Sequence, residues 1–148
     1  MTLGENKERI SRFFDEVSNK GHVGPGVDEF FASNYINHDP GNPDVRPGIE
    51  GIKRLFNKVH AAFPNQHYTI EDMIAEGDKV VVRWTGDFGK HAAEFMGIPP
   101  TGKGVRGIAG ITIYRLARGK IVERWLGVDW LGMMRQLGAM PTPRQTKK

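Results

Sequence analysis

Residues 105–128, VRGIAGITIYRLARGKIVERWLGV, decide the fold, because they contain two long β-type runs around one turn. The runs Val105 to Leu116 and Lys120 to Val128 are rich in the β-branched and aromatic residues that strands favour. Arg118-Gly119 lies between them, and glycine is common in turns that reverse the chain direction. The stretch therefore predicts an antiparallel hairpin.

The same signals extend upstream to about residue 68. A run from Lys79 to Phe88 follows the turn Glu76-Gly77-Asp78, and an alternating stretch from Tyr68 to Ile74 precedes that turn. The Pro/Gly-rich loop Gly97 to Gly102 separates these strands from the hairpin. We expect a meander of about four antiparallel strands.

The first 65 residues have helical periodicity instead. Ile10, Phe13, Phe14 and Val17 have the i, i+3, i+4, i+7 spacing of a helix face. We expect helices at Asn6 to about Lys20, after Pro25, from Gly48 to Phe63, and at Trp130 to Leu137, with Tyr35 to Pro40 extended. The pattern predicts an α+β domain over residues 1–140, with helices in a curved antiparallel sheet of four or more strands and a disordered tail at 141–148.

Composition limits the function classes. The chain has 148 residues, a formal net charge of +4 and no cysteine, so thiolate nucleophiles and thiolate metal sites are excluded. Basic residues are scattered among acids, which argues against nucleic-acid binding. No stretch reaches the roughly 18 apolar residues of a membrane span. We expect no signal peptide, no membrane contact and a cytoplasmic location.

Several short motifs give the chain a family resemblance. They are Asn37-His38-Asp39-Pro40, Ala62-Phe63-Pro64-Asn65, Glu76 to Arg83, Gly89-Lys90-His91 with Glu94-Phe95, Gly97 to Lys103, and Gly119 to Trp125 with Asp129. In this order, over about residues 5 to 138, the chain resembles the SnoaL-like polyketide cyclase (ester cyclase) family of the NTF2-like superfamily.

The resemblance implies a cone-shaped α+β fold, often a homo-oligomer, with no metal and no cofactor. Characterised members close a polyketide ring by intramolecular aldol condensation, and relatives include hydroxylases and epoxide hydrolases. Asp129 matches the family's acid/base aspartate by position. The chain departs from the family at Lys90, where threonine is common, and at 111–115, where some cyclases place Gln and His.

Asp129 has two readings from the residues alone. Alternation puts Gly127, Trp125, Glu123 and Ile121 on its face of the last strand, where a desolvated carboxylate would be a general base. Because it directly precedes Trp130, it could equally be the N-cap of the last helix.

The other candidates come from the same motifs. His38 could shuttle a proton, or hold loop backbone, and its neighbour Asp39 should point to the opposite face. Arg83 could bind a carboxylate or enolate oxygen, or lie on the solvated face. We predict Asp129 and His38 as catalytic, with the following substrate-binding set: Arg83, His91, Trp125 and Asn37.

Two apparent motifs do not indicate a function. Gly97 to Lys103 fits G-x-x-x-x-G-K, but Gly104 follows and two prolines remove backbone donors, so it is not a phosphate-binding loop. The five histidines show no metal-ligand spacing.

Three functions therefore compete. One is cofactor-independent acid/base chemistry, an aldol-type cyclisation or isomerisation, on a small hydrophobic carbonyl compound. The second is a non-catalytic domain that binds a small apolar ligand. The third is a hydrolase or hydroxylase in which Asp129 activates water. Apolar strand residues in excess of one core, such as Val81, Ile111 and Ile113, predict a dimer or tetramer.

Overall fold

The computed structural model describes residues 1–141, so the expected tail lies almost entirely outside the described residues. The helices are α1 (Leu3–Phe13), the π-helix η1 (Phe14–Asn19), α2 (Val23–Phe30), α3 (Ile49–Ala62) and α4 (Trp130–Gln136). The strands are β1 (Phe31–His38), β2 (His67–Glu76), β3 (Lys79–Asp87), β4 (Gly89–Lys90), β5 (Gly104–Val105), β6 (Ile108–Ala117) and β7 (Lys120–Val128).

Five strands form one curved sheet in the order β1-β7-β6-β3-β2. The predicted antiparallel meander is confirmed as β2, β3, β6 and β7. The sheet is nevertheless mixed, because β1 pairs with β7 in parallel. β4 and β5 form a separate two-stranded hairpin in the loop between β3 and β6.

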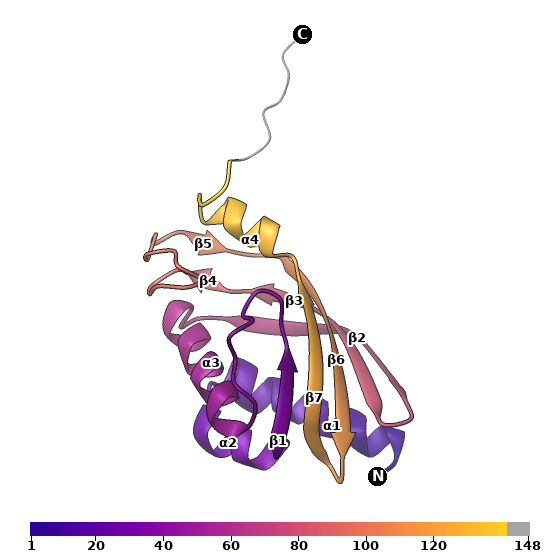
Figure 1. Ribbon diagram of the computed structural model, residues 1–148. Helices are drawn as coiled ribbons and strands as arrows, with labels where there is room; N and C mark the ends of the chain where they lie inside the picture. Colours follow the sequence, from indigo (N-terminus) through magenta and orange to yellow (C-terminus); the bar gives the residue numbers. More distant parts are fainter. Residues whose placement is uncertain (142–148) are drawn as a thin grey trace.

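The helices α1, α2 and α3 gather on one side of the sheet, and α4 lies at the end where β7 stops (Figure 1). The other side of the sheet carries no helix (Figure 1). Apolar side chains from the helices and the inner sheet face form one buried cluster, including Phe13, Phe31, Tyr35, Ile52 and Tyr114. That residues 1–140 act as one domain remains a prediction with which this single core is consistent.

The first predicted helix is real but changes its winding midway. Thr2 and Glu5 form a capping box at its start, which satisfies backbone donors that a helix N-terminus leaves free. From Phe14 the helix continues as η1, and such π-turns are frequent at functional sites. Phe14 and Ser18 of η1 line the internal cavity described below.

Two β-bulges in the antiparallel part of the sheet decide which side chains face inward, and the register also shifts once between β1 and β7. The pairing of β2 with β3 shifts register between Ile70 and Asp72. In β7, Val122 has no partner on β6, because Glu123 pairs with Arg115 and Ile121 pairs with Leu116. A bulge inserts one residue and therefore switches the faces beyond it. As a result Ile74, which simple alternation places in the core with Tyr68, is 64% exposed.

Candidate active site

An internal cavity lies between the inner face of the sheet and the helices η1 and α3. Its empty volume is about 650 Å³, including the solvent at its mouth. Most of the wall is aromatic or aliphatic. The polar side chains that matter for chemistry in it are Asp39, His60, Gln66, Tyr68, Tyr114 and Arg124.

Arg124 brings a buried positive charge to the cavity. It lies on β7 with 5% of its surface exposed, and its guanidinium packs 5.2 Å from the ring centre of Phe56. Its Nε donates a hydrogen bond to Oδ1 of Asn37 at 2.8 Å. Within residues 1–141 the guanidinium forms no second hydrogen bond of normal geometry, but the hydroxyls of Tyr35 and Tyr114 lie close enough for Arg124 to lower the pKa of both.

Tyrosine hydroxyls surround this charge. Burial raises the pKa of Tyr114 to about 12, although the nearby Thr112 and Arg124 lower it. Burial likewise raises the pKa of Tyr35, whose hydroxyl donates to Oδ1 of Asn37 at 2.6 Å. Both phenols therefore keep their protons at neutral pH and can act only as hydrogen-bonding groups.

Asp39 places a carboxylate in the same cavity. It is 5% exposed and directly follows β1. Its Oδ1 accepts the backbone N–H of Gly41 at 3.0 Å, and its Oδ2 accepts Nδ2 of Asn42 at 3.0 Å. Each oxygen retains acceptor capacity, because an ionised carboxylate has about four acceptor positions.

A fixed hydrogen-bond chain forms another part of the wall. His60 Nε2 lies 3.0 Å from the carbonyl oxygen of Val17, which makes Nε2 the protonated nitrogen. Nδ1 of His60 then accepts from Nε2 of Gln66 at 2.7 Å, and Oε1 of Gln66 accepts from the Tyr68 hydroxyl at 3.1 Å. Burial lowers the pKa of His60, so the ring stays neutral near pH 7. Both nitrogens are occupied, which makes His60 a positioning group rather than a proton acceptor.

None of the six residues predicted from sequence lines the cavity. The Asp129 side chain caps α4, where its Oδ1 accepts the N–H of Gly132 at 2.9 Å. Its neighbours Val128 and Trp130 line the cavity instead. Whether Asp129 or any of the other five takes part in the reaction remains a prediction.

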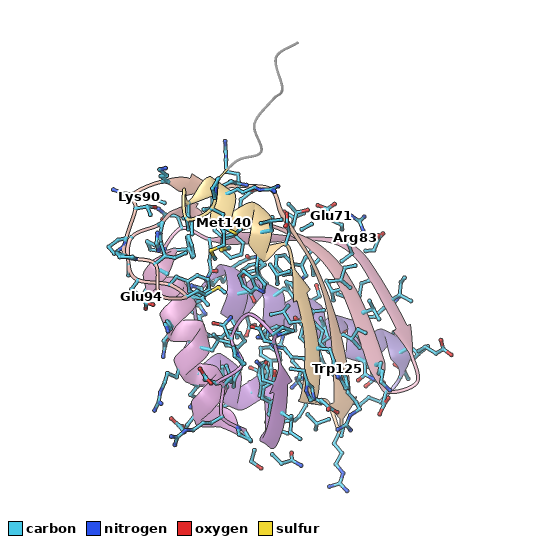
Figure 2. The ribbon with its side chains drawn as sticks, turned by 45° about the horizontal axis from the view of Figure 1, so that its top comes forward. Glu71, Arg83, Lys90, Glu94, Trp125 and Met140 are labelled. Atoms are coloured by element: carbon cyan, nitrogen blue, oxygen red, sulfur yellow. The ribbon has the colours of Figure 1, made fainter. Side chains whose placement is uncertain are left out.

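His38 and Trp125 are brought together on the outer face of the sheet. Their rings stack at 5.3 Å with an interplanar angle of 10°. His38 Nε2 lies 2.7 Å from Glu123 Oε2, and Glu123 Oε1 accepts from Arg115 Nε at 2.9 Å. The hydrogen bonds from His38 and then Arg115 lower the pKa of Glu123. Figure 2 shows Trp125 on β7.

Arg83 also lies on the outer face, in an exposed ion pair with Asp72 at 2.6 Å (Figure 2). His91 is fully buried, stacks on Phe63, and accepts the N–H of Thr101 at Nδ1. Its Nε2 is buried without a partner among the described residues. Asn37 contacts Arg124 rather than the open cavity, so its contribution to binding would be indirect.

Neither a metal cluster nor a membrane helix stands out in residues 1–141. Within that range, no three His, Asp or Glu side chains lie together in a way that could hold a metal ion. None of the described helices is both long and apolar enough to cross a membrane.

Comparison with known proteins agrees with this architecture. The family model described as SnoaL-like polyketide cyclase matches residues 8–137. The chain belongs to the SnoaL-like polyketide cyclase family. Two proteins whose names state a reaction are similar to this chain over most of its length.

Nogalonic acid methyl ester cyclase of Streptomyces nogalater is 28% identical over 112 residues, which cover 76% of this chain and 83% of that protein. Aklanonic acid methyl ester cyclase DnrD of Streptomyces peucetius is 32% identical over 122 residues, covering 79% and 81%. The structure of TsrD from Streptomyces laurentii superposes with a TM-score of 0.84 at 26% identity, covering 95% of this chain and 99% of that one.

Sequence reasoning missed Arg124, His60 and Gln66 as cavity residues. Alternation could have indicated Arg124. It lies on the same face of β7 as Leu126 and Val128, which line the cavity, and it is the one cation of these three. The expectation that Asp39 and His38 face opposite ways is confirmed, since Asp39 is buried and His38 is exposed. His60 had no such signal, because one of its partners, the carbonyl oxygen of Val17, is 43 residues away in sequence and the other, Gln66, belongs to no recognisable motif.

Proposed function

We propose that the cavity is the active site of a cofactor-independent enzyme that performs aldol-type cyclisation or isomerisation on a small hydrophobic carbonyl compound. The observation that carries this proposal is the pairing of a buried guanidinium, Arg124, with a carboxylate, Asp39, in one largely apolar cavity. The names of the two cyclase relatives support the same reaction class.

The chemistry needs a base and an electrostatic stabiliser. Asp39 removes a proton from the carbon next to a carbonyl, and the resulting enolate oxygen is stabilised by the amino groups of Arg124. The enolate carbon attacks a second carbonyl of the same molecule, which forms the ring bond. The new alkoxide takes the proton back from Asp39, so the product is an isomer of the substrate and needs no co-reactant.

Asp129 remains the alternative base, with His38 as its predicted partner, because the family resemblance points to its position. In that mechanism the carboxylate would have to leave Gly132 and turn toward the cavity between Val128 and Trp130. Arg83, His91, Trp125 and Asn37 remain the proposed binding residues that accompany this alternative.

A non-catalytic ligand-binding role is the second candidate. The observation favouring it is that both oxygens of Asp39 already accept hydrogen bonds from its own loop. Such a carboxylate could serve only to hold the loop. A location in the cytoplasm stays a prediction that rests on the lack of cysteine in the sequence.

The test measures whether the protein isomerises a carbonyl compound or exchanges its protons with solvent. The protein is incubated in D₂O with aklanonic acid methyl ester, and products are followed by liquid chromatography with mass spectrometry. A catalytic cavity gives deuterium at the carbon next to a carbonyl, or a product of unchanged composition. Asp39→Asn and Arg124→Met should abolish both signals. Tight binding of the ester with neither signal would favour the binding role.

We also propose that the bare outer face of the sheet is an interface between copies of this chain. Ile111 is 52% exposed there and Ile74 is 64% exposed, beside the half-buried Val81, Ile113 and Trp125. Exposed apolar clusters of this kind commonly mark protein–protein contacts. A dimer or tetramer would cover them.

A further inference from the structure

A second hollow lies outside the cavity, beside the start of α3. Its empty volume is about 840 Å³ with the solvent in it. One wall is the loop from Gly41 to Arg46, another is the α3 face that carries Arg54 and Lys58, and Met96 closes a third side. Asn42 and Leu55 line both this outer hollow and the inner cavity, so the two spaces adjoin.

Close backbone contacts hold the loop between the two spaces. A Cβ atom on Gly41 would overlap the indole of Trp130, which lines the inner cavity. A Cβ atom on Gly51, in the first turn of α3, would overlap the carbonyl oxygen of Arg46. Both glycines therefore permit an approach that any larger residue would prevent. The loop is seated on α3, and this fixes the backbone of Arg46 next to the helix.

The outer hollow carries a net positive charge. Its lining contains Arg46, Arg54 and Lys58 against one acid, Asp44. Neither arginine forms an ion pair or a side-chain hydrogen bond with any of residues 1–141. Lys58 approaches only Glu94, at 3.8 Å, and half of each side chain is exposed. Such a pair contributes little to stability and is readily exchanged for another anion.

The three cations come from positions that converge. Arg54 and Lys58 are four residues apart, so they lie on one face of α3. Arg46, on the loop, lines the same hollow. Glu94, the nearest acid to Lys58, comes from the segment after β4 and lies beside the end of α3 (Figure 2). A concave surface with one sign of charge attracts small anions more strongly than a flat one.

We propose that the outer hollow binds an anionic group, a carboxylate or a phosphate monoester, on a substrate whose apolar body enters the inner cavity past Asn42 and Leu55, the two residues that line both spaces. This inference rests on the proposed function, because it assumes that the inner cavity takes a hydrophobic ligand. Guanidinium groups suit the role, since each can donate two parallel hydrogen bonds to either anion. The substrate class is thus an amphipathic carbonyl compound with an anionic end, unlike the methyl esters named for the two cyclase relatives.

The experiment compares two fluorescent probes with the same aromatic skeleton. 8-Anilinonaphthalene-1-sulfonate carries an anion, and N-phenyl-1-naphthylamine lacks it. The test variant is Arg46→Gln/Arg54→Gln/Lys58→Gln. The matched control is Lys7→Gln/Lys79→Gln/Arg118→Gln, which removes the same charge from residues that line neither space. Thermal melting verifies that each variant is folded.

We expect the test variant to bind the sulfonate at least about fivefold more weakly while its affinity for the neutral probe changes less than about twofold. The control variant should bind both probes like the original chain. Raising the salt concentration should weaken only the sulfonate, and less so in the test variant. Decanoate and monodecyl phosphate are then compared as competitors of the sulfonate, and the one that displaces it at lower concentration carries the preferred anion.

Failure of this inference is separable from failure of the proposed function. Equal loss of sulfonate binding in the test and control variants, or no loss in either, overturns the anion site but leaves the cavity intact. Leu126→Phe, which narrows the inner cavity, should weaken both probes. Absence of binding by both probes in the original chain would overturn the anion site and the hydrophobic cavity together.

Discussion

Arg124 and Asn37 are register partners across the parallel pair of β7 and β1, and their side chains are joined by a hydrogen bond from Nε to Oδ1 of 2.8 Å. The strand that the meander prediction omitted therefore holds the charge in the cavity. The same Oδ1 accepts the hydroxyl of Tyr35, while Nδ2 of Asn37 is buried without a partner in residues 1–141. Asn37 thus acts on the cavity through Arg124.

Replacement of Asn37 should distinguish the charge of Arg124 from the hydrogen bond that orients it. Asn37→Ala leaves the fully buried hydroxyl of Tyr35 without its acceptor, and we expect a loss of about 1–3 kcal/mol in the free energy of unfolding. Asn37→Asp keeps the acceptor and gives Arg124 a counter-charge, so the fold should persist while activity falls. Urea unfolding and turnover, measured on both variants, check this. Full activity of Asn37→Asp would show that the Arg124 charge is not used.

His60 should make stability depend on pH in the neutral range. Burial holds its pKa below the ordinary 6.5, so below that pH the unfolded chain binds a proton that the folded chain refuses. Stability is then complete above about pH 6.5 and falls as pH is lowered toward the folded pKa. Melting temperatures between pH 8 and pH 5 should show the decline, and His60→Gln should flatten it.

The exposed histidine His67 is the matched control for His60, and His67→Gln should leave the pH profile unchanged. Titration of Glu123 does not contribute to the decline in stability between pH 7 and pH 5. Its lowered pKa contributes stability that is lost only as pH falls below its ordinary value of 4.5. A decline between pH 7 and pH 5 that survives in His60→Gln would contradict the assignment.

Most of the fold could be predicted because its signals are periodic. The apolar stripes of α1 and α3 and the runs of β3, β6 and β7 are long and regular, and they were placed within a few residues. β1 was read only as an extended segment, because its sequence FASNYINH alternates poorly and its partner β7 lies about 90 residues away. A parallel partner at that distance leaves no local trace.

The site was harder to predict, and for the candidates on β7 the bulge in that strand is a physical reason. Plain alternation groups Ile121 with Glu123 and Trp125, whereas the unpaired Val122 sends Ile121 inward and leaves Glu123 and Trp125 on the other face. The buried Ile121 therefore does not show which way the residues after the bulge face, and Trp125 lies on the outer face although alternation from Ile121 places it inside. A single inserted residue has no signature in hydropathy, so only the strand pairing reveals it.

The proposed interface predicts a specific loss of assembly. Ile111→Arg places a charge in the middle of the bare sheet face, where we expect the assembled form to revert to the 16.6 kDa of one chain. Leu3→Arg is the control, because Leu3 is a similarly exposed apolar residue on α1 rather than on the sheet. Light scattering at micromolar concentration measures the mass. A single-chain mass for the original protein would remove the interface.

The two carboxylates can be distinguished by paired substitutions. Asp129→Asn keeps an oxygen for the N–H of Gly132, so the α4 cap and the melting temperature should hardly change. Asp129→Ala loses the cap and should cost about 1 kcal/mol of stability. Asp39→Asn keeps the shape but loses the basicity, and loss of a general base typically lowers the rate about 10²- to 10⁴-fold.

Turnover and melting temperature must therefore be measured together on Asp129→Asn, Asp129→Ala and Asp39→Asn. If Asp39 is the base, only Asp39→Asn loses the rate, and both Asp129 variants retain it apart from the stability effect of the alanine. If Asp129 is the base, both of its variants are inactive although the asparagine form is stable. In that case its carboxylate has to exchange the N–H of Gly132 for the substrate during each turnover, because in the resting fold it caps α4.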